Sequence, residues 1–301
     1  MKYLPGKSSR SGQALLLVLL SMAVVLTVVL SILSRSITDV SVTTREEEAL
    51  RAFSAAEAGV EQSLVIGTGL GETQIGEATF RTTVTSAVAS AKEFASPAGL
   101  FSGESLTFWL VGHDDSGDLV CDATHSCFTG SQIKICWGKA GTPGDSVQTP
   151  AIEASIYYDR TPGNDATVRI ARITTDPNTV RAASNHFSGT DGATCTTAGE
   201  NFAFSKTINF AGLGIPAAVY QTQDGLQYLK VRMFYNTGET QPVGILVTAA
   251  AGNGNLPSQG LRISSVGVSG DVNRSIDVFE GYSEAPSIFD ASVFSLGGLT
   301  Q

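Results

Sequence analysis

Two hydrophobic patterns follow one another at the start of the chain. Residues 13–33 contain no charged side chain and consist mostly of leucine, valine and alanine. As a helix this run is roughly 30 Å long, at about 1.5 Å per residue, which matches the hydrocarbon core of a bilayer. The pattern therefore predicts a transmembrane segment over residues 13–33.

The second pattern continues the helix beyond the bilayer. No proline occurs between residues 35 and 66, and Leu50, Phe53, Val60 and Leu64 recur at helical spacing, with alanines beside them. Glycines are frequent from Gly67 onward, which indicates the helix end. We expect one continuous helix over residues 13–66, with an apolar stripe that packs against another surface. The residues assigned to this packing are Leu17, Leu50, Phe53, Glu57, Gly59 and Val60.

The rest of the chain alternates β-branched and aromatic runs with turn residues, which is typical of strands. The predicted strands are residues 78–84, 105–111, 132–137, 151–158, 167–174, 202–209, 228–235, 244–248, 261–268 and 274–279. Turn-forming residues at 162–165 and 269–271 separate neighbouring runs and indicate hairpins. Residues 113–130 and 250–260 are expected to be surface loops.

These elements predict an α+β protein. The second half of the long amino-terminal helix would pack on a large, mostly antiparallel β-rich body. Residues 1–12 would be a cytoplasmic leader, because they carry three cations and no acid. Residues 67–301 would form an extracytoplasmic β-rich domain, in which the extra strands build either an enlarged sheet or an inserted β-lobe.

Composition excludes two classes of protein. With 42% hydrophobic and 16% charged residues, the chain is not disordered by composition. Its net charge of −9 disfavours nucleic acid, and the windows around residues 160, 169–172 and 230–232 contain no dense group of cations. We therefore expect no nucleic-acid partner.

Four cysteines lie in the part expected outside the membrane, namely Cys121, Cys127, Cys136 and Cys195. An even number in an oxidising compartment favours disulfides, with three possible pairings. At least one bond is expected among the first three cysteines, which are close in sequence. Their spacing matches no usual zinc motif.

Other chemistry finds little support in the sequence. Asp114, Asp115 and Asp118 are weak calcium candidates, since they lack the EF-hand pattern and its terminal glutamate. The three histidines are far apart, and no nucleophile elbow or zinc-protease helix motif is present. We expect no catalytic residue, no resident metal and no cofactor, and hence no enzyme.

Two segments resemble a known family. Residues 11–20, Ser-Gly-Gln-Ala-Leu-Leu-Leu-Val-Leu-Leu, and residues 51–61, Arg-Ala-Phe-Ser-Ala-Ala-Glu-Ala-Gly-Val-Glu, resemble the amino-terminal region of PilX-type minor pilins. They are also similar to the atypical minor pseudopilin of type II secretion. The resemblance covers the region up to residue 65 and does not extend into the β-rich part.

The resemblance implies a maturation route. A prepilin peptidase would cut after Gly12, and Gln13 would become the methylated amino terminus. The subunit would then leave the membrane through an inner-membrane pilus assembly platform and join other pilin or minor pilin subunits. Its destination would be an extracellular filament at the cell surface, where filament assembly or adhesion would be its role.

One departure from the family pattern concerns position in the filament. Major pilins carry a glutamate at the fifth mature position, which pairs with the amino terminus of a neighbouring subunit, whereas this chain has Leu17. An unpaired charge in an apolar core is costly. The departure therefore favours a place at or near the filament tip. The alternatives are a single-span anchored extracellular binding module that never enters a filament, and an anchored enzyme.

Overall fold

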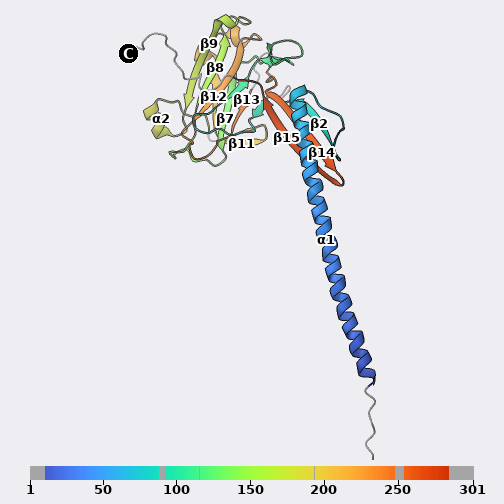
Figure 1. Ribbon diagram of the computed structural model, residues 1–301. Helices are drawn as coiled ribbons and strands as arrows, with labels where there is room; N and C mark the ends of the chain where they lie inside the picture. The colour runs from blue at the N-terminus through green and yellow to red at the C-terminus, as the bar shows by residue number, and fades with distance from the viewer. Residues whose placement is uncertain (1–10, 88–91, 115, 193, 248–253, 285–301) are drawn as a thin grey trace, which may run out of the picture. The chain divides into compact units, whose positions relative to one another are not determined.

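The computed structural model describes residues 11–87, 92–114, 116–192, 194–247 and 254–284 (Figure 1). The chain divides into two compact units. Unit 1 comprises Met1–Thr83 and Ser264–Asp277, and unit 2 comprises Val84–Ile263 and Val278–Gln301. The segments of the two units thus alternate along the sequence, and each unit is described by itself.

Unit 1 is built on one long helix, α1, which spans Ser11–Ile66. It ends as predicted, because Gly67 adopts a positive φ of 76° and its N–H donates to the carbonyl oxygen of Ser63 at 2.8 Å. Glycine adopts this conformation without the strain that a Cβ atom imposes. The single continuous helix expected from the sequence is confirmed.

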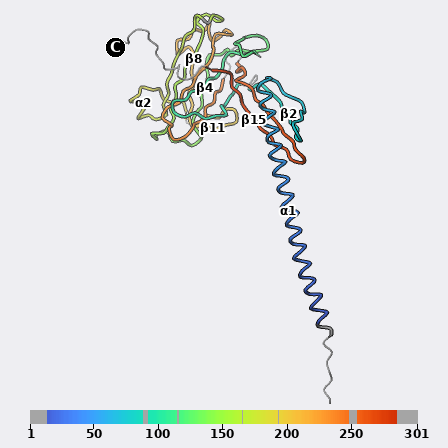
Figure 2. Tube along the Cα trace, in the orientation of Figure 1, coloured from blue at the N-terminus to red at the C-terminus, as the bar shows by residue number. Residues whose placement is uncertain are grey.

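The strands that lie wholly or largely in unit 1 form a four-stranded sheet with the order β1-β2-β14-β15. Their bounds are β1 Thr73–Ile75, β2 Ala78–Ser86, β14 Gly260–Ser269 and β15 Val272–Gly281. Figure 2 shows that segments far apart in the sequence, β2 and β15, lie in the same part of the trace beside the end of α1. The second half of α1 packs on this sheet, so the α+β prediction is confirmed.

Unit 2 contains two larger sheets and a small hairpin. The first sheet has the order β10-β11-β7-β13-β3, with β10 Cys195–Thr197, β11 Glu200–Asn209, β7 Gln132–Lys139, β13 Val243–Leu246 and β3 Glu93–Ala95. The second has the order β4-β12-β8-β9, with β4 Ser105–Trp109, β12 Leu226–Phe234, β8 Ala151–Asp159 and β9 Val168–Thr175. The hairpin pairs β5, Gly112–His113, with β6, Leu119–Val120.

Short helices complete unit 2. They are α2 Thr179–Asn185, α3 Ala217–Tyr220 and the 3-10 turns η1 Asp165–Thr167 and η2 Ala211–Leu213.

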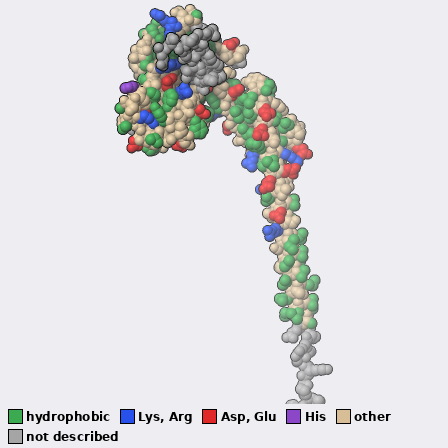
Figure 3. Space-filling view, turned by 60° about the vertical axis from the view of Figure 1, so that its left-hand side comes forward, with side chains coloured by type: hydrophobic (Ala, Val, Ile, Leu, Met, Phe, Trp, Pro, Cys, Tyr) green, Lys and Arg blue, Asp and Glu red, His purple; other side chains and the backbone are tan. Residues whose placement is uncertain are grey.

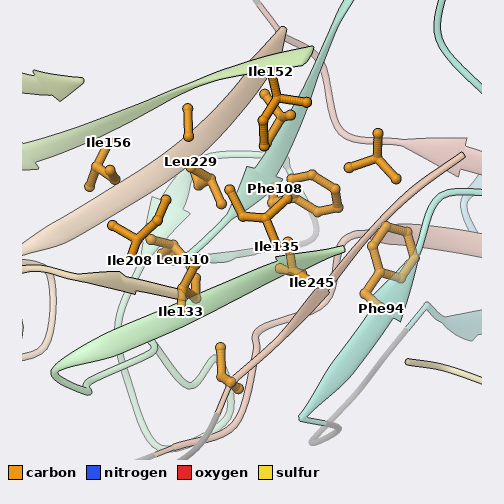
Figure 4. Packing of buried hydrophobic residues seen from close by; sticks show 14 of the residues in the cluster. Phe94, Phe108, Leu110, Ile133, Ile135, Ile152, Ile156, Ile208, Leu229 and Ile245 are labelled. Atoms are coloured by element: carbon orange, nitrogen blue, oxygen red, sulfur yellow. The ribbon is translucent and has the colours of Figure 1, made fainter. Parts of the chain in front are cut away.

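The core of unit 2 lies between its two sheets. One cluster of buried side chains combines Ile133, Ile135 and Ile245 of the first sheet with Phe108 and Leu229 of the second. Figure 4 shows these side chains meeting between the strands. The two sheets therefore pack face to face as a sandwich.

Each of the ten predicted strands corresponds to an observed strand, although Thr248, at the end of one, lies outside the described residues. Both predicted hairpins are present, since β8 pairs antiparallel with β9 and β14 neighbours β15. The sequence did not predict β1, β3, β5, β6 or β10, which are only two or three residues long. Alternation of period two has no room to show in such short strands.

Candidate functional site

The first half of α1 is an uncovered apolar surface. Every described side chain from Ala14 to Val42 is exposed, and Leu17 is 64% exposed. The helix is long and apolar enough to cross a membrane. Figure 3 shows hydrophobic side chains along this part, with charged ones following nearer the sheet. Gly12 and Gln13 lie in α1, but their surroundings fall outside the described residues.

The second half of α1 buries a face of small residues against the sheet of unit 1. The buried residues on the helix are Ala52, Ala55, Ala56, Gly59, Val60 and Ser63. The sheet presents Ala78, Phe80, Thr82, Ser265, Gly267 and Ser269, all of them also buried. Because most of these side chains are short on both sides, helix and sheet approach closely.

Two glycines make this approach possible. A Cβ atom on Gly59 would lie 2.5 Å from Ser265 Oγ and 2.8 Å from the ring of Phe80. A Cβ atom on Gly267 would overlap the carbonyl oxygen of Ala52. The Oγ atoms of Ser63 and Thr82 add a buried hydrogen bond of 2.6 Å between helix and sheet.

The apolar stripe predicted on α1 differs from the face that the chain buries. Gly59 and Val60 are buried as expected, but Leu50 is 69% and Phe53 is 44% exposed. Glu57 is exposed as well. Each residue of a helix is rotated by roughly 100° about the helix axis. Leu50 and Phe53 therefore lie about a quarter of a turn or more around α1 from the centre of its buried face. Leu50 and Phe53 therefore do not lie on the face that packs against the sheet of unit 1, where alanine and glycine allow the closer contact.

We call Leu50, Phe53 and Leu64 the uncovered stripe. Each is a large apolar side chain exposed on the part of α1 that lies beyond the apolar first half. Burying a side chain of this size contributes about 1.5–3 kcal/mol. The uncovered stripe is therefore a surface from which association with another molecule would gain free energy.

A groove of about 610 Å³ adjoins the uncovered stripe within unit 1. Its walls are residues 50, 51, 54 and 55 of α1 and residues 75–78 of the turn between β1 and β2. Arg51 bridges them, since its guanidinium donates to Glu47 at 2.6 Å and to Glu77 at 2.5 Å. Leu50 and Ile75 give the groove an exposed apolar rim.

The cysteines form two disulfides in unit 2. Cys121 pairs with Cys127, which confirms the prediction of a bond among the first three cysteines. Cys136 pairs with Cys195 and joins β7 to β10, a pairing that spacing alone left open. Disulfides are typical of proteins that fold outside the cytoplasm.

Asp114, one of the three calcium candidates, accepts hydrogen bonds within its own loop. Asp114 Oδ1 accepts hydrogen bonds from the backbone N–H groups of Ser116 and Asp118, at 2.8 and 3.0 Å. That carboxylate therefore stabilises its own turn. Asp115 lies outside the described residues. In the part of the chain that the structure describes, no group of three potential ligands could hold a metal ion.

The expected surface loop over residues 113–130 is buried at both ends. His113 is buried beside Trp109, with ring centroids 4.5 Å apart, and stacks on Tyr282 at 3.8 Å. Burial lowers the pKa of His113 to about 4, although the charge of Asp114 opposes this change. Cys127 and the residues up to 130 are buried as well. Only the middle of this segment is a surface loop.

Comparisons with protein-family models, with curated proteins and with solved structures find no significant match for this chain. Its function is therefore inferred from the long helix, the sheet that the helix packs on, and the surfaces that both leave uncovered.

Proposed function

We propose that this chain is a minor pilin-like structural subunit of a type IV pilus or pseudopilus, placed at or near the filament tip. The observation that carries the proposal is the uncovered stripe of Leu50, Phe53 and Leu64. A plain membrane anchor needs an apolar surface only across the bilayer. Here large apolar side chains continue along the same helix beyond the predicted span, where a bilayer would not cover them.

Helices of other subunits are the partners that fit this surface. The uncharged run over residues 13–33 loses its lipid contacts if the subunit leaves the membrane, so its apolar surface must then pack on other apolar helices. The uncovered stripe and the groove beside it lie along the same helix. Packing between α1 and the helices of neighbouring pilin subunits would bury both surfaces together.

The tip position is supported by Leu17. Its side chain is exposed and uncharged, so it cannot neutralise the amino terminus of a subunit above. By its resemblance to pilins, the chain would accept a neighbour below and none above. Its other partners would be the prepilin peptidase and the assembly platform, and the β-rich part would initiate assembly or contact a surface.

The processing step is tested by mass spectrometry of the mature amino terminus. We expect a chain beginning at Gln13 in cells with an active prepilin peptidase. The variant Gly12→Val should remain full length, because a branched Cβ atom crowds a peptidase site shaped for glycine. Gly6→Val, which changes a glycine elsewhere in the leader, is the matched control and should be processed normally. A wild-type protein that keeps residues 1–12 contradicts the proposal.

The tip position needs a separate measurement. Quantitative mass spectrometry of purified filaments and immunogold labelling should find a few copies at one filament end. The wild-type chain, with leucine at position 17, should assemble without the acid that Leu17→Glu would restore. Dense labelling along the shaft would show a repeating subunit, and absence from filaments would favour the alternative, an anchored extracellular binding module.

A further inference from the structure

In the second sheet of unit 2, a row of large apolar side chains faces away from the core. Strands β12, β8 and β9 lie side by side in this sheet (Figure 1). The core cluster takes every second residue of β8 and β12 next to Tyr157 and Tyr228, so both tyrosines point outward. Their rings stack with centroids 4.2 Å apart, and register places Trp109 of β4 and Ile170 of β9 on either side of them. We call these four residues the outer row.

Three cations share this side of the sheet with the outer row. Lys230 and Arg172 flank Ser155 in the next register row, and Arg232 pairs with Glu153 in the row after that. Glu153 is the only acid in these two rows, so they carry a net positive charge on a chain whose net charge is −9. The outer row and the three cations together form what we call the outer face.

Arg172 is the cation of the outer face that an added acid can reach. Its side chain is 49% exposed, whereas Lys230 is 5% exposed. Glu153 already approaches Arg172 at 3.8 Å, but a guanidinium has five N–H donors and can serve more than one carboxylate. The outer face thus suits a partner that combines apolar side chains with an acid.

The last described residues of the chain lead to one end of the outer row. Tyr282 stacks on His113 with ring centroids 3.8 Å apart, and His113 packs edge-on against Trp109 at 4.5 Å. Trp109 in turn lies 5.3 Å from Tyr228. The chain therefore reaches the Trp109 end of the outer row only two residues before the described part ends at Glu284.

The residues that follow have the composition that this face requires. Residues 285–301, which we call the trailing segment, lie outside the described part of the chain. They contain one acid, Asp290, and no cation, and Phe289 and Phe294 are among their apolar residues. Extended, these seventeen residues would reach about 55 Å, whereas the four strands are only about 15 Å across.

We propose that the trailing segment of the same chain docks on the outer face, so that its phenylalanines cover the stacked tyrosines and Asp290 binds Arg172. Attachment beside Trp109 gives the segment a high effective concentration at this face, which favours it over a second copy of the chain. The inference is independent of the proposed pilin-like function.

Photocrosslinking of the full chain in detergent micelles tests the docking. A chain with p-benzoylphenylalanine at position 289 should form links to peptides that contain Tyr157 or Tyr228, identified by mass spectrometry, in a product of monomer mass. A product of twice that mass would show that the segment docks on a second copy. That outcome, links to other peptides alone, or no links at all would each overturn the proposal.

Tyrosine nitration provides a second measurement, with a control on the same strand. Removing residues 285–301 should make Tyr157 and Tyr228 react several-fold faster with tetranitromethane than in the full chain. Tyr158, which packs against the core cluster, should react equally in both chains. Unchanged nitration of Tyr157 and Tyr228 would contradict the docking.

Charge variants test the contact between Asp290 and Arg172. Arg172→Glu should lower the crosslink yield several-fold, and adding Asp290→Arg to this variant should restore it. Arg169→Glu is the matched control, because Arg169 is exposed on the same strand but pairs with Tyr158, outside the rows of the outer face. Equal yields from Arg172→Glu and Arg169→Glu would show that Asp290 does not bind Arg172.

Discussion

Gly267 of β14 and Ala52 of α1 approach so closely that a Cβ atom on Gly267 would overlap the carbonyl oxygen of Ala52. The backbone of the helix thus lies directly against the backbone of the strand. Neither partner can be enlarged without moving the helix, because backbone atoms cannot yield as a flexible side chain does. This contact fixes the position of α1 on the sheet of unit 1.

Gly267→Ala should therefore loosen α1 from its sheet. We expect a loss of roughly 3 kcal/mol, at the upper end of overpacking effects. Hydrogen exchange in micelles measures this directly, as reduced protection of the amides from Ala52 to Ser63. Gly71→Ala is the matched control, because Gly71 has open space and no positive φ. Equal protection in both variants would show that α1 does not pack on the sheet through the contact between Gly267 and Ala52.

The uncovered stripe should matter for assembly and not for folding. Phe53→Gln should lower the thermal midpoint of the isolated chain only slightly, because the side chain is already 44% exposed. It should reduce incorporation into filaments, measured by the subunit content of sheared preparations. Ala56→Gln, on the buried face, should instead destabilise the chain itself. A Phe53→Gln chain that assembles at the normal level would argue against the stripe as a packing surface.

The two disulfides should contribute unequally to stability. Cys136–Cys195 spans 59 residues, whereas Cys121–Cys127 spans 6. On the chain-entropy argument, the longer loop stabilises unit 2 by about 4 kcal/mol and the shorter by about 2 kcal/mol. Replacing each pair with alanines and comparing urea midpoints checks the order. A larger loss from the shorter loop would mean that local strain or packing outweighs loop entropy.

His113 should make unit 2 sensitive to mild acid. Its pKa is lowered from 6.5 to about 4 by burial, so between these values the unfolded chain binds more protons than the folded one. Stability is therefore complete above about pH 6.5 and falls by up to about 3 kcal/mol as the pH approaches 4. His113→Phe keeps an aromatic ring against Tyr282 and removes the titration.

Urea unfolding between pH 7 and pH 4 measures the effect, and the wild type should lose more stability than His113→Phe. Asp176 cannot produce this difference. Although burial raises its pKa, hydrogen bonds from Arg181 and Asn178 lower the value overall, and the group is present in both proteins. Parallel pH profiles for the two proteins would mean that His113 is not the group responsible.

Local chemistry allowed the helix, its end and the longer strands to be predicted. Each of these elements is indicated by a local pattern. A long uncharged run indicates the helix, a glycine after the last turn indicates its end, and alternating β-branched residues indicate the strands. The buried face of α1 was not predicted, because alanine and glycine score weakly as apolar residues. Their advantage is small size, and this matters only once Gly267 and Phe80 on the sheet are known to lie opposite.

The cations of unit 2 are a second feature whose proximity the sequence could not reveal. Lys230 and Arg172 are 58 positions apart in the sequence, and each is aligned with Ser155 of β8 in the sheet register. Glu153 lies on the same strand and approaches Arg172 at 3.8 Å. Windows along the sequence cannot detect such neighbours, because a sheet joins residues by register. For the same reason, the Cys136–Cys195 pairing became visible only in the fold.

The insertion of unit 2 between β2 and β14 constrains the order of synthesis and folding. When a ribosome has made α1 and β2, the strand that carries Gly267 is still nearly two hundred residues away in the sequence. Contacts of such long range form slowly, since closing a long loop costs entropy before the contact forms. The part of the small-residue face of α1 that packs on β14 must therefore stay open while residues 87–259 are translated. During that interval a chaperone or a neighbouring subunit could reach a surface that the finished molecule hides.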